Sequence, residues 1–186
     1  MKSLHFLLQR SISLFLSLVL IFLPLSANPI VIDANSSNTS LDKTNNGVDI
    51  VNIATPDKNG ISNNLYLEFN VKENGLIFNN SISALTPSVL GKIITANPNL
   101  INPASFILNQ VTSTYPSLLL WIMEIAGSSA SLLIANPNGI TCQGCGFINA
   151  NNVTLATGLP QIKDNGYIEF NIQRGAINLN SLNALG

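Results

Sequence analysis

The chain has 186 residues, and only 9% of them are charged, against about 25% in an ordinary soluble domain. A 46% hydrophobic content and a formal net charge of −1 argue against intrinsic disorder. Lys and Arg form no basic stripe, which gives no support to a nucleic-acid partner. The single histidine, His5, lies near the N-terminus, so the rest of the chain lacks the commonest general base and most zinc-ligand sets. Abundant Asn instead suits many turns and side-chain ladders between stacked strands.

The first residues have the pattern of a secretory signal peptide. A positively charged start is followed by an apolar run over residues 12–23 and then by the small pair Ser26-Ala27. We predict a signal peptide over residues 1–27. The alternative is an uncleaved anchor, but a membrane-spanning helix needs about 20 apolar residues, and this run is shorter. We therefore expect residues 28–186 to form one mature domain, with six positive and nine negative side chains and a net charge near −3.

The first half of the mature chain reads as short strands. Residues 30–32 can pair as a strand, whereas residues 35–46 are polar and small and predict a loop. From Val48 onward, short apolar runs are separated by Asn, Gly and Pro. Residues 65–71 alternate between apolar and polar positions, as in a half-buried strand, and residues 76–80 form another short run that ends in two Asn.

The second half continues this pattern. Residues 104–111 favour a strand or an irregular connection over a short helix, which is the alternative. Residues 118–125 are the most apolar stretch of the mature chain and, since they contain Glu124, predict one buried strand instead of a membrane helix. Residues 132–135 predict a second buried strand, joined to the first through the small residues 127–129.

Two further strands are expected, at residues 167–172 and 176–179, after a turn at residues 164–166. Short strands at close spacing allow a sandwich, a barrel or a β-solenoid, and periodicity alone does not separate these folds. The irregular recurrence of these strands and of one near Val153 is weak support for the coils of a solenoid.

The most informative motif is Asn136-Pro137-Asn138-Gly139-Ile140. Pro137 presets φ for the first corner of a type I turn, and the Asn136 side chain can accept a hydrogen bond from the backbone two residues on. Gly139 can then adopt the left-handed conformation that leads back into a strand. A shorter copy of this turn, Asn97-Pro98-Asn99-Leu100, lies about 40 residues upstream.

Cys142 and Cys145 follow this turn, and three explanations are possible for them. A thioredoxin-like redox pair needs a βαβ setting and a helix N-terminus, whereas this pair lies among glycines. A zinc site needs two more ligands. A local structural disulfide in an oxidising compartment is the favoured interpretation. Its loop is tiny, so we expect a stabilisation at the low end of the usual ~0–5 kcal/mol.

Many motifs along the chain resemble, in order, the N-terminal secretion domain of two-partner-secretion exoproteins, the family of filamentous haemagglutinins and contact-dependent inhibition toxins. The resemblance covers roughly residues 40 to 180. The matching motifs are Asn46-Gly47-Val48, residues 51–56, Gly60-Ile61-Ser62, Phe69-Asn70-Val71, residues 75–81, 97–100, 124–127 and 134–140, Phe147-Ile148-Asn149 and residues 153–158. Two positions depart from the family pattern: Asn63-Asn64 stands near a common His, and the bulky Trp121 stands near a position that is often small.

The resemblance implies a fold. It implies an all-β, right-handed parallel β-helix with antiparallel cap strands at its N-terminal end. Such a cap is reasonable because an open solenoid end exposes strand edges that would otherwise recruit other chains. Residues 28–186 would then be the two-partner-secretion (haemagglutinin activity) domain. Because the sequence stops at Gly186 in mid-pattern, we expect this domain to be truncated at its C-terminal end.

The resemblance also implies a function. The chain would cross the inner membrane through the Sec machinery and be recognised by the periplasmic domains of an Omp85-like outer-membrane transporter. It would then nucleate β-helix folding outside the cell, secreted or at the surface of a Gram-negative-type bacterium, with any host-cell or neighbouring-cell target bound by downstream repeats. The best candidates for transporter recognition are Asn97, Pro98, Asn99, Leu100, Asn136, Pro137, Asn138, Gly139 and Ile140, with a purely structural role in turns as the equal alternative.

Other function classes are less well supported. A stand-alone adhesin fragment that binds a host surface or a carbohydrate is the second hypothesis. A β-helix enzyme would need a cluster of carboxylates, which the sequence does not display, so we expect no enzyme activity, no cofactor and no metal site. We interpret Glu124 as a strand residue that faces water or pairs locally, in preference to a recognition or catalytic carboxylate.

Overall fold

The computed structural model describes residues 30–172 and 175–183, so the expected signal peptide lies outside the described residues. Every named element in this part of the chain is a β-strand. No helix within it is long and apolar enough to cross a membrane. The strands are β1 (Val31–Ile32), β2 (Ser40–Lys43), β3 (Asp49–Asn52), β4 (Ile61–Glu68), β5 (Leu76–Asn80), β6 (Thr86–Ser88), β7 (Lys92–Ile94), β8 (Phe106–Val111), β9 (Ser117–Leu119), β10 (Ile122–Gly127), β11 (Ala130–Ala135), β12 (Ile140–Ile148), β13 (Ala150–Ala156), β14 (Gly158–Ile162), β15 (Ile168–Ile172) and β16 (Ile177–Leu182).

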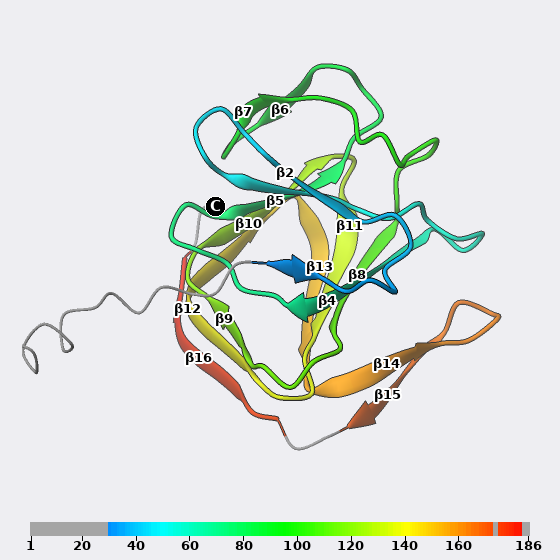
Figure 1. Cartoon of the computed structure of the whole chain (residues 1–186), viewed down its shortest axis with the longest axis vertical. Helices are drawn as coiled ribbons and strands as arrows, with labels where there is room; N and C mark the ends of the chain where they lie inside the picture. The colour runs from blue at the N-terminus through cyan, green and yellow to red at the C-terminus, as the bar shows by residue number, and fades with distance from the viewer. Residues whose placement is uncertain (1–29, 173–174, 184–186) are drawn as a thin grey trace, which may run out of the picture.

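The chain winds into coils with three faces (Figure 1). The first face contains β3, β5, β10 and the end of β12, and the second contains β4, β8, β11 and β13. The third contains β9, the start of β12 and β16. Neighbouring strands within each of these faces are parallel, because each strand pairs with its counterpart one coil away. The predicted all-β parallel β-helix is therefore confirmed.

In successive coils, residues of the same kind lie above one another. On the first face Val51, Phe78 and Ile125 are register partners, and all three lie in the main core. Each such buried aliphatic or aromatic side chain stabilises the fold by about 1.5–3 kcal/mol. The next register position holds Asn52 and Asn79, and Asn79 Nδ2 donates to Asn52 Oδ1 at 2.8 Å. This pair is a ladder of the kind that the abundance of Asn predicted.

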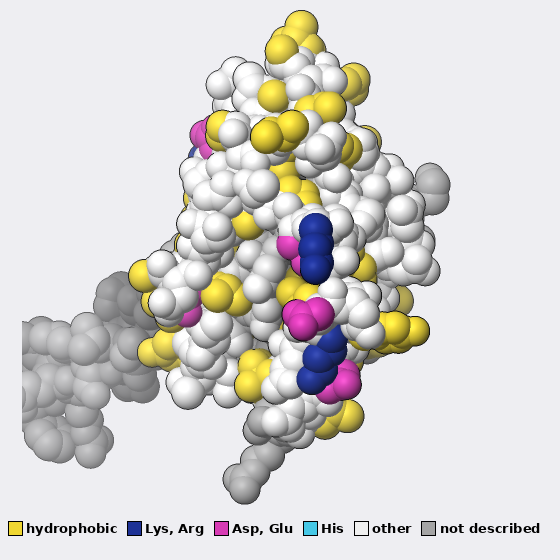
Figure 2. Space-filling model, turned by 90° about the vertical axis from the view of Figure 1, so that its right-hand side faces the viewer, with side chains coloured by type: hydrophobic (Ala, Val, Ile, Leu, Met, Phe, Trp, Pro, Cys, Tyr) yellow, Lys and Arg dark blue, Asp and Glu magenta, His cyan; other side chains and the backbone are white. Residues whose placement is uncertain are grey.

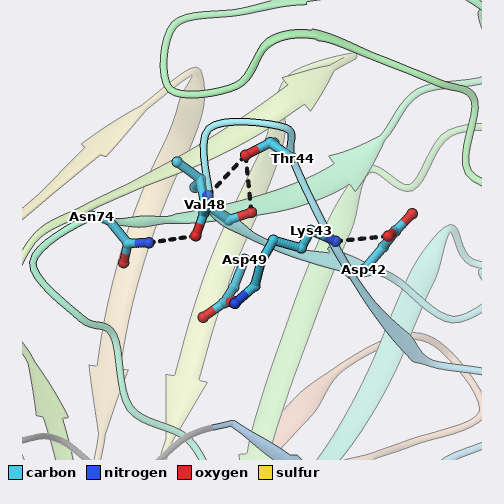
Figure 3. Close-up of polar contacts among 7 residues, drawn as sticks. Asp42, Lys43, Thr44, Val48, Asp49 and Asn74 are labelled. Carbon is cyan, nitrogen blue, oxygen red and sulfur yellow. Dashed lines mark hydrogen bonds and ion pairs between the residues drawn. The ribbon is translucent and has the colours of Figure 1, made fainter.

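Antiparallel strands cap the N-terminal end of the coils. β1 pairs with the end of β4, and β2 pairs with β3, so each strand of the first coil has a cap strand on its outer edge. Figure 3 shows the turn between β2 and β3, in which Thr44 Oγ1 accepts a hydrogen bond from Val48 N at 2.8 Å. Lys43 Nζ lies 3.1 Å from Asp49 Oδ1 beside this turn, and Asn74 Nδ2 donates to Gly47 O at 2.6 Å. The expected cap is thus present and attached to the second coil.

Two antiparallel hairpins leave the coils. The β6–β7 hairpin lies outside the first face, and the β14–β15 hairpin lies outside the second (Figure 1). They cover apolar side chains on the outer sides of these faces: Ile94 of β7 packs with Ile50 and Ile77, and Ile162 of β14 packs against Leu108 and Leu133. The helix therefore has an interior core and two smaller external ones.

Three strand predictions need correction. Residues 35–46 contain β2, which the sequence missed because this edge strand is mostly exposed and carries no alternating pattern. Residues 118–125 are not one strand but parts of β9 and β10, on different faces, with a corner at Leu120-Trp121. The apolar run is continuous because both faces point into the same core. The strand expected at residues 167–172 is β15, which forms a hairpin with β14 instead of a coil.

Candidate functional site: the two Asn-Pro-Asn turns

The first turn is closed by the side chain and backbone of Asn97. Asn99 N donates to Asn97 Oδ1 at 2.9 Å, and Leu100 N donates to Asn97 O at 3.2 Å. This is the Asx geometry that the Asn-Pro-Asn pattern predicted. Asn97 N also donates to Ser81 O at 2.8 Å, which ties the turn to the chain just beyond β5.

The amide groups of this turn reach back to the first two coils. Asn97 is 2% exposed, and its Nδ2 donates to Ile53 O at 3.0 Å and to Asn79 O at 2.8 Å. Asn99 Nδ2 donates to Asn38 O at 2.7 Å and to Ile53 O at 3.1 Å. In the folded chain, both amides thus donate to main-chain carbonyl groups at this corner.

The second turn repeats this arrangement one coil later. Asn138 N donates to Asn136 Oδ1 at 2.9 Å, and Gly139, with φ of +113°, donates from its N to Asn136 O at 3.1 Å. Asn136 is fully buried, and its Nδ2 donates to Tyr115 O at 3.0 Å and to Ser117 Oγ at 2.9 Å. Asn138 Nδ2 donates to Ser113 O at 2.7 Å. In both motifs, therefore, a buried Asn closes a turn and its amide hydrogen-bonds to the preceding coil.

The structure does not bring the two turns to one site. Asn97 lies at the corner between the first and second faces, before β8, and Asn136 lies at the corner between the second and third faces, after β11. In each turn the first Asn is buried, whereas Pro98 and Asn138 remain exposed. A partner that meets the folded domain would contact only the outer edges of these turns.

The two cysteines lie where β12 bends between two faces. Residues 140–142 pair with β9 and β16 on the third face, and residues 146–148 pair with β10 on the first. Gly144 occupies the corner with φ of +86°, a conformation that other residues rarely adopt. A disulfide joins Cys142 to Cys145 across this corner, with their Cα atoms 5.3 Å apart and both side chains buried.

Comparison with known proteins identifies this architecture. The family model described as TPS secretion domain matches residues 30–183. The chain belongs to the TPS secretion domain family. The crystal structure of the filamentous hemagglutinin secretion domain superposes with a TM-score of 0.76 at 39% identity, over 82% of this chain and 50% of that one.

Curated relatives of this TPS domain are much longer than the chain itself. The 16S rRNA endonuclease CdiA of Enterobacter cloacae subsp. cloacae is 44% identical over 174 residues, which are 92% of this chain and 5% of that protein. The filamentous hemagglutinin of Bordetella pertussis is 43% identical over 143 residues, 76% of this chain and 4% of that protein. The family match assigns a secretion domain to residues 30–183, and the nuclease activity in the name of the first relative belongs to that much longer protein.

Glu124 of the TPS domain has an environment that the sequence did not reveal. It is 3% exposed, so the expectation that it faces water is wrong. Its Oε1 accepts from Val89 N at 2.8 Å, and its Oε2 accepts from Leu90 N at 2.9 Å and from Ser88 Oγ at 2.8 Å. These donors lie 34 to 36 residues earlier, so the pairing is not local either.

The alternation of β10 explains this burial. Met123 and Ile125 point into the main core, so Glu124 points to the outer side of the first face, where the β6–β7 hairpin covers it. The only sign in the sequence of this contact between Glu124 and the hairpin was the presence of a carboxylate in an apolar strand. Within the described residues, no cluster of three or more metal-ligating side chains occurs.

Proposed function

We propose that this TPS domain is the secretion signal of a large exoprotein. In this proposal, the periplasmic domains of an Omp85-like outer-membrane transporter recognise the chain, and the domain then nucleates β-helix folding outside the cell. The observation that carries the proposal is the family match over residues 30–183, together with a β-helix whose first coil is capped. The exoprotein would reach the periplasm through the Sec machinery and end secreted or on the surface of a Gram-negative-type bacterium.

Recognition before folding fits the chemistry of the turns. The amides of Asn97 and Asn136 are buried and hydrogen-bonded inside the folded domain, so a partner could read them only in a chain that has not yet folded. An extended chain can also add to the edge of a periplasmic sheet through main-chain hydrogen bonds. When the chain folds, the same amides form internal hydrogen bonds and are no longer accessible to the transporter. Folding would therefore release the chain and prevent it from binding again.

Nucleation of the fold outside the cell fits the architecture. In the described part of the chain, β1 and β2 close the N-terminal end, so each later coil can add to the edge of the coil before it. Solenoids fold by this nearest-neighbour growth. The free energy released by each added coil would favour outward movement without a nucleotide in the periplasm.

The experiment must separate recognition from stability. The chain is expressed with and without its partner transporter, and the protein in the culture medium is measured for the wild type and for an Asn136→Ala/Asn138→Ala variant. The matched control is Asn64→Ala, which removes an equally buried, internally bonded amide from β4, outside both turns.

We expect release that requires the transporter, and a larger loss of secretion for the turn variant than for Asn64→Ala at equal loss of stability. Equal losses in both variants would assign the second turn a structural role alone. Release that does not depend on the transporter would contradict the proposed function itself.

A further inference from the structure

A groove separates the β14–β15 hairpin from the outer side of the second face. One residue from each of four neighbouring strands forms its floor: Ile61, Phe106, Leu133 and Thr154. Three spacings of ~4.8 Å between strands give this floor a length of roughly 14 Å. The hairpin crosses the whole face, since Gly166 at its tip lies beside Asn59 in the loop before β4. The cavity has a volume of about 690 Å³, within the range of small-molecule sites.

Aromatic rings line the groove from both sides. Phe106 contributes from the floor, and Tyr167 and Phe170 contribute from the hairpin. Tyr167 is 73% exposed, so its ring is accessible to a ligand in the groove. Rings held open toward a groove offer flat apolar surfaces on which a ligand can stack.

The groove also offers unused polar groups. Thr154 and Asn165 line it together with Tyr167. Within the described residues, the Thr154 hydroxyl, the Tyr167 hydroxyl and the Asn165 Nδ2 have no hydrogen-bond partner, whereas the amides of the two Asn-Pro-Asn turns are all engaged. A ligand that carries several hydroxyl groups would satisfy these donors and acceptors.

The lack of charged side chains among the groove residues that the structure describes favours a neutral ligand. None of the described residues that line the groove is charged. Figure 2 shows most of the charged side chains on this side of the molecule in one narrow band, and two of the hairpin's charges, Lys163 and Glu169, pair with each other at 2.9 Å. An anionic ligand would therefore find no free cation among these lining residues.

We propose that this groove binds a short neutral oligosaccharide after the domain has folded. Sugar rings stack on Phe106, Tyr167 and Phe170, and sugar hydroxyl groups bond to Thr154, Tyr167 and Asn165. A peptide is the less favoured ligand, because the floor of the groove is the face of a sheet, where strands present side chains and not main-chain groups. This binding is distinct from the proposed secretion role and can fail or succeed without it.

The test uses an array of neutral and anionic oligosaccharides with the purified chain, followed by saturation-transfer NMR on the best neutral probe, with sialyllactose as the anionic comparison. Tyr167→Ala should weaken binding roughly tenfold, the loss expected for one stacking ring. Thr154→Val, which keeps the side-chain shape, should also weaken it. The matched control is Tyr115→Ala, which removes a ring that is 56% exposed but lies outside the groove.

Saturable binding of a neutral probe that Tyr167→Ala weakens and Tyr115→Ala does not would support the site. Absence of binding to every neutral probe would overturn it. Equal effects of the two Tyr variants, or binding of anionic probes or peptides alone, would overturn it as well. Circular dichroism of each variant checks that its β-sheet content matches the wild type.

Discussion

Ser88 Oγ donates to Glu124 Oε2 at 2.8 Å and accepts from Gly91 N at 2.8 Å, so one buried carboxylate organises the turn of the β6–β7 hairpin. With the bonds from Val89 N and Leu90 N, the carboxylate has three donors from the hairpin. Hydrogen bonds to an ionised group are roughly twice as strong as neutral ones. Glu124 is therefore the residue that attaches this hairpin to the third coil.

Glu124→Gln should lower the free energy of unfolding by about 2–3 kcal/mol, because one acceptor oxygen becomes an NH₂ group that faces donors in a buried site. Urea denaturation of the purified domain measures the change. The control is Glu169→Gln, since Glu169 lies in an exposed ion pair that contributes about 0–1 kcal/mol. Equal stability of the two variants would argue against the attachment role of Glu124.

Asn97→Ala should destabilise the domain by about 2–4 kcal/mol, because it leaves the buried carbonyl groups of Ile53 and Asn79 without these donors and opens the Asx turn. Thermal and urea unfolding measure this loss. Asn151→Ala, at an exposed position of β13, should change stability by less than about 0.5 kcal/mol. A small effect of Asn97→Ala would mean that water replaces its bonds between coils.

We expect the stability of the domain to depend on pH through Asp33, which follows the cap strand β1. The hydrogen bond from the Thr112 hydroxyl, and next the bond from Asn35 N, hold the pKa of Asp33 below its ordinary value. Because the folded pKa lies below the unfolded one, the stabilisation is present above the unfolded pKa, about 3.9, and is lost as pH falls through the folded pKa.

We therefore expect wild-type stability to decline below about pH 4, and Asp33→Asn to flatten this part of the profile. Thr112→Val should move the pKa of Asp33 back toward its ordinary value, which an NMR titration of the carboxyl group would detect. An unchanged titration in this variant would show that Thr112 does not control Asp33.

Removal of the disulfide should have a small effect. A loop closed by four residues predicts a loss of about 2 kcal/mol or less for Cys142→Ala/Cys145→Ala. The β-sheet circular dichroism spectrum should stay the same, because the strand pairing on both sides of the corner does not depend on the bond. Loss of the folded state under reducing conditions would show instead that the bend of β12 requires the disulfide.

Local chemistry was readable from the sequence. The turns at Asn97 and Asn136 depend on a side chain that bonds the backbone two residues on, and Cys142 and Cys145 are close enough along the chain to pair. The order of the motifs, through the resemblance that they carry, also indicated the β-helix and its cap.

Contacts between distant segments were decided only by the tertiary structure. Glu124 is buried because a hairpin from about 35 residues earlier folds over it, and residues 118–125 divide between two faces because the coil turns a corner at Trp121. The groove beside Tyr167 likewise exists only because the β14–β15 hairpin crosses the second face. The spacing of apolar residues predicts whether a side chain is buried. Which segment buries it depends on the packing of segments that are distant in the sequence.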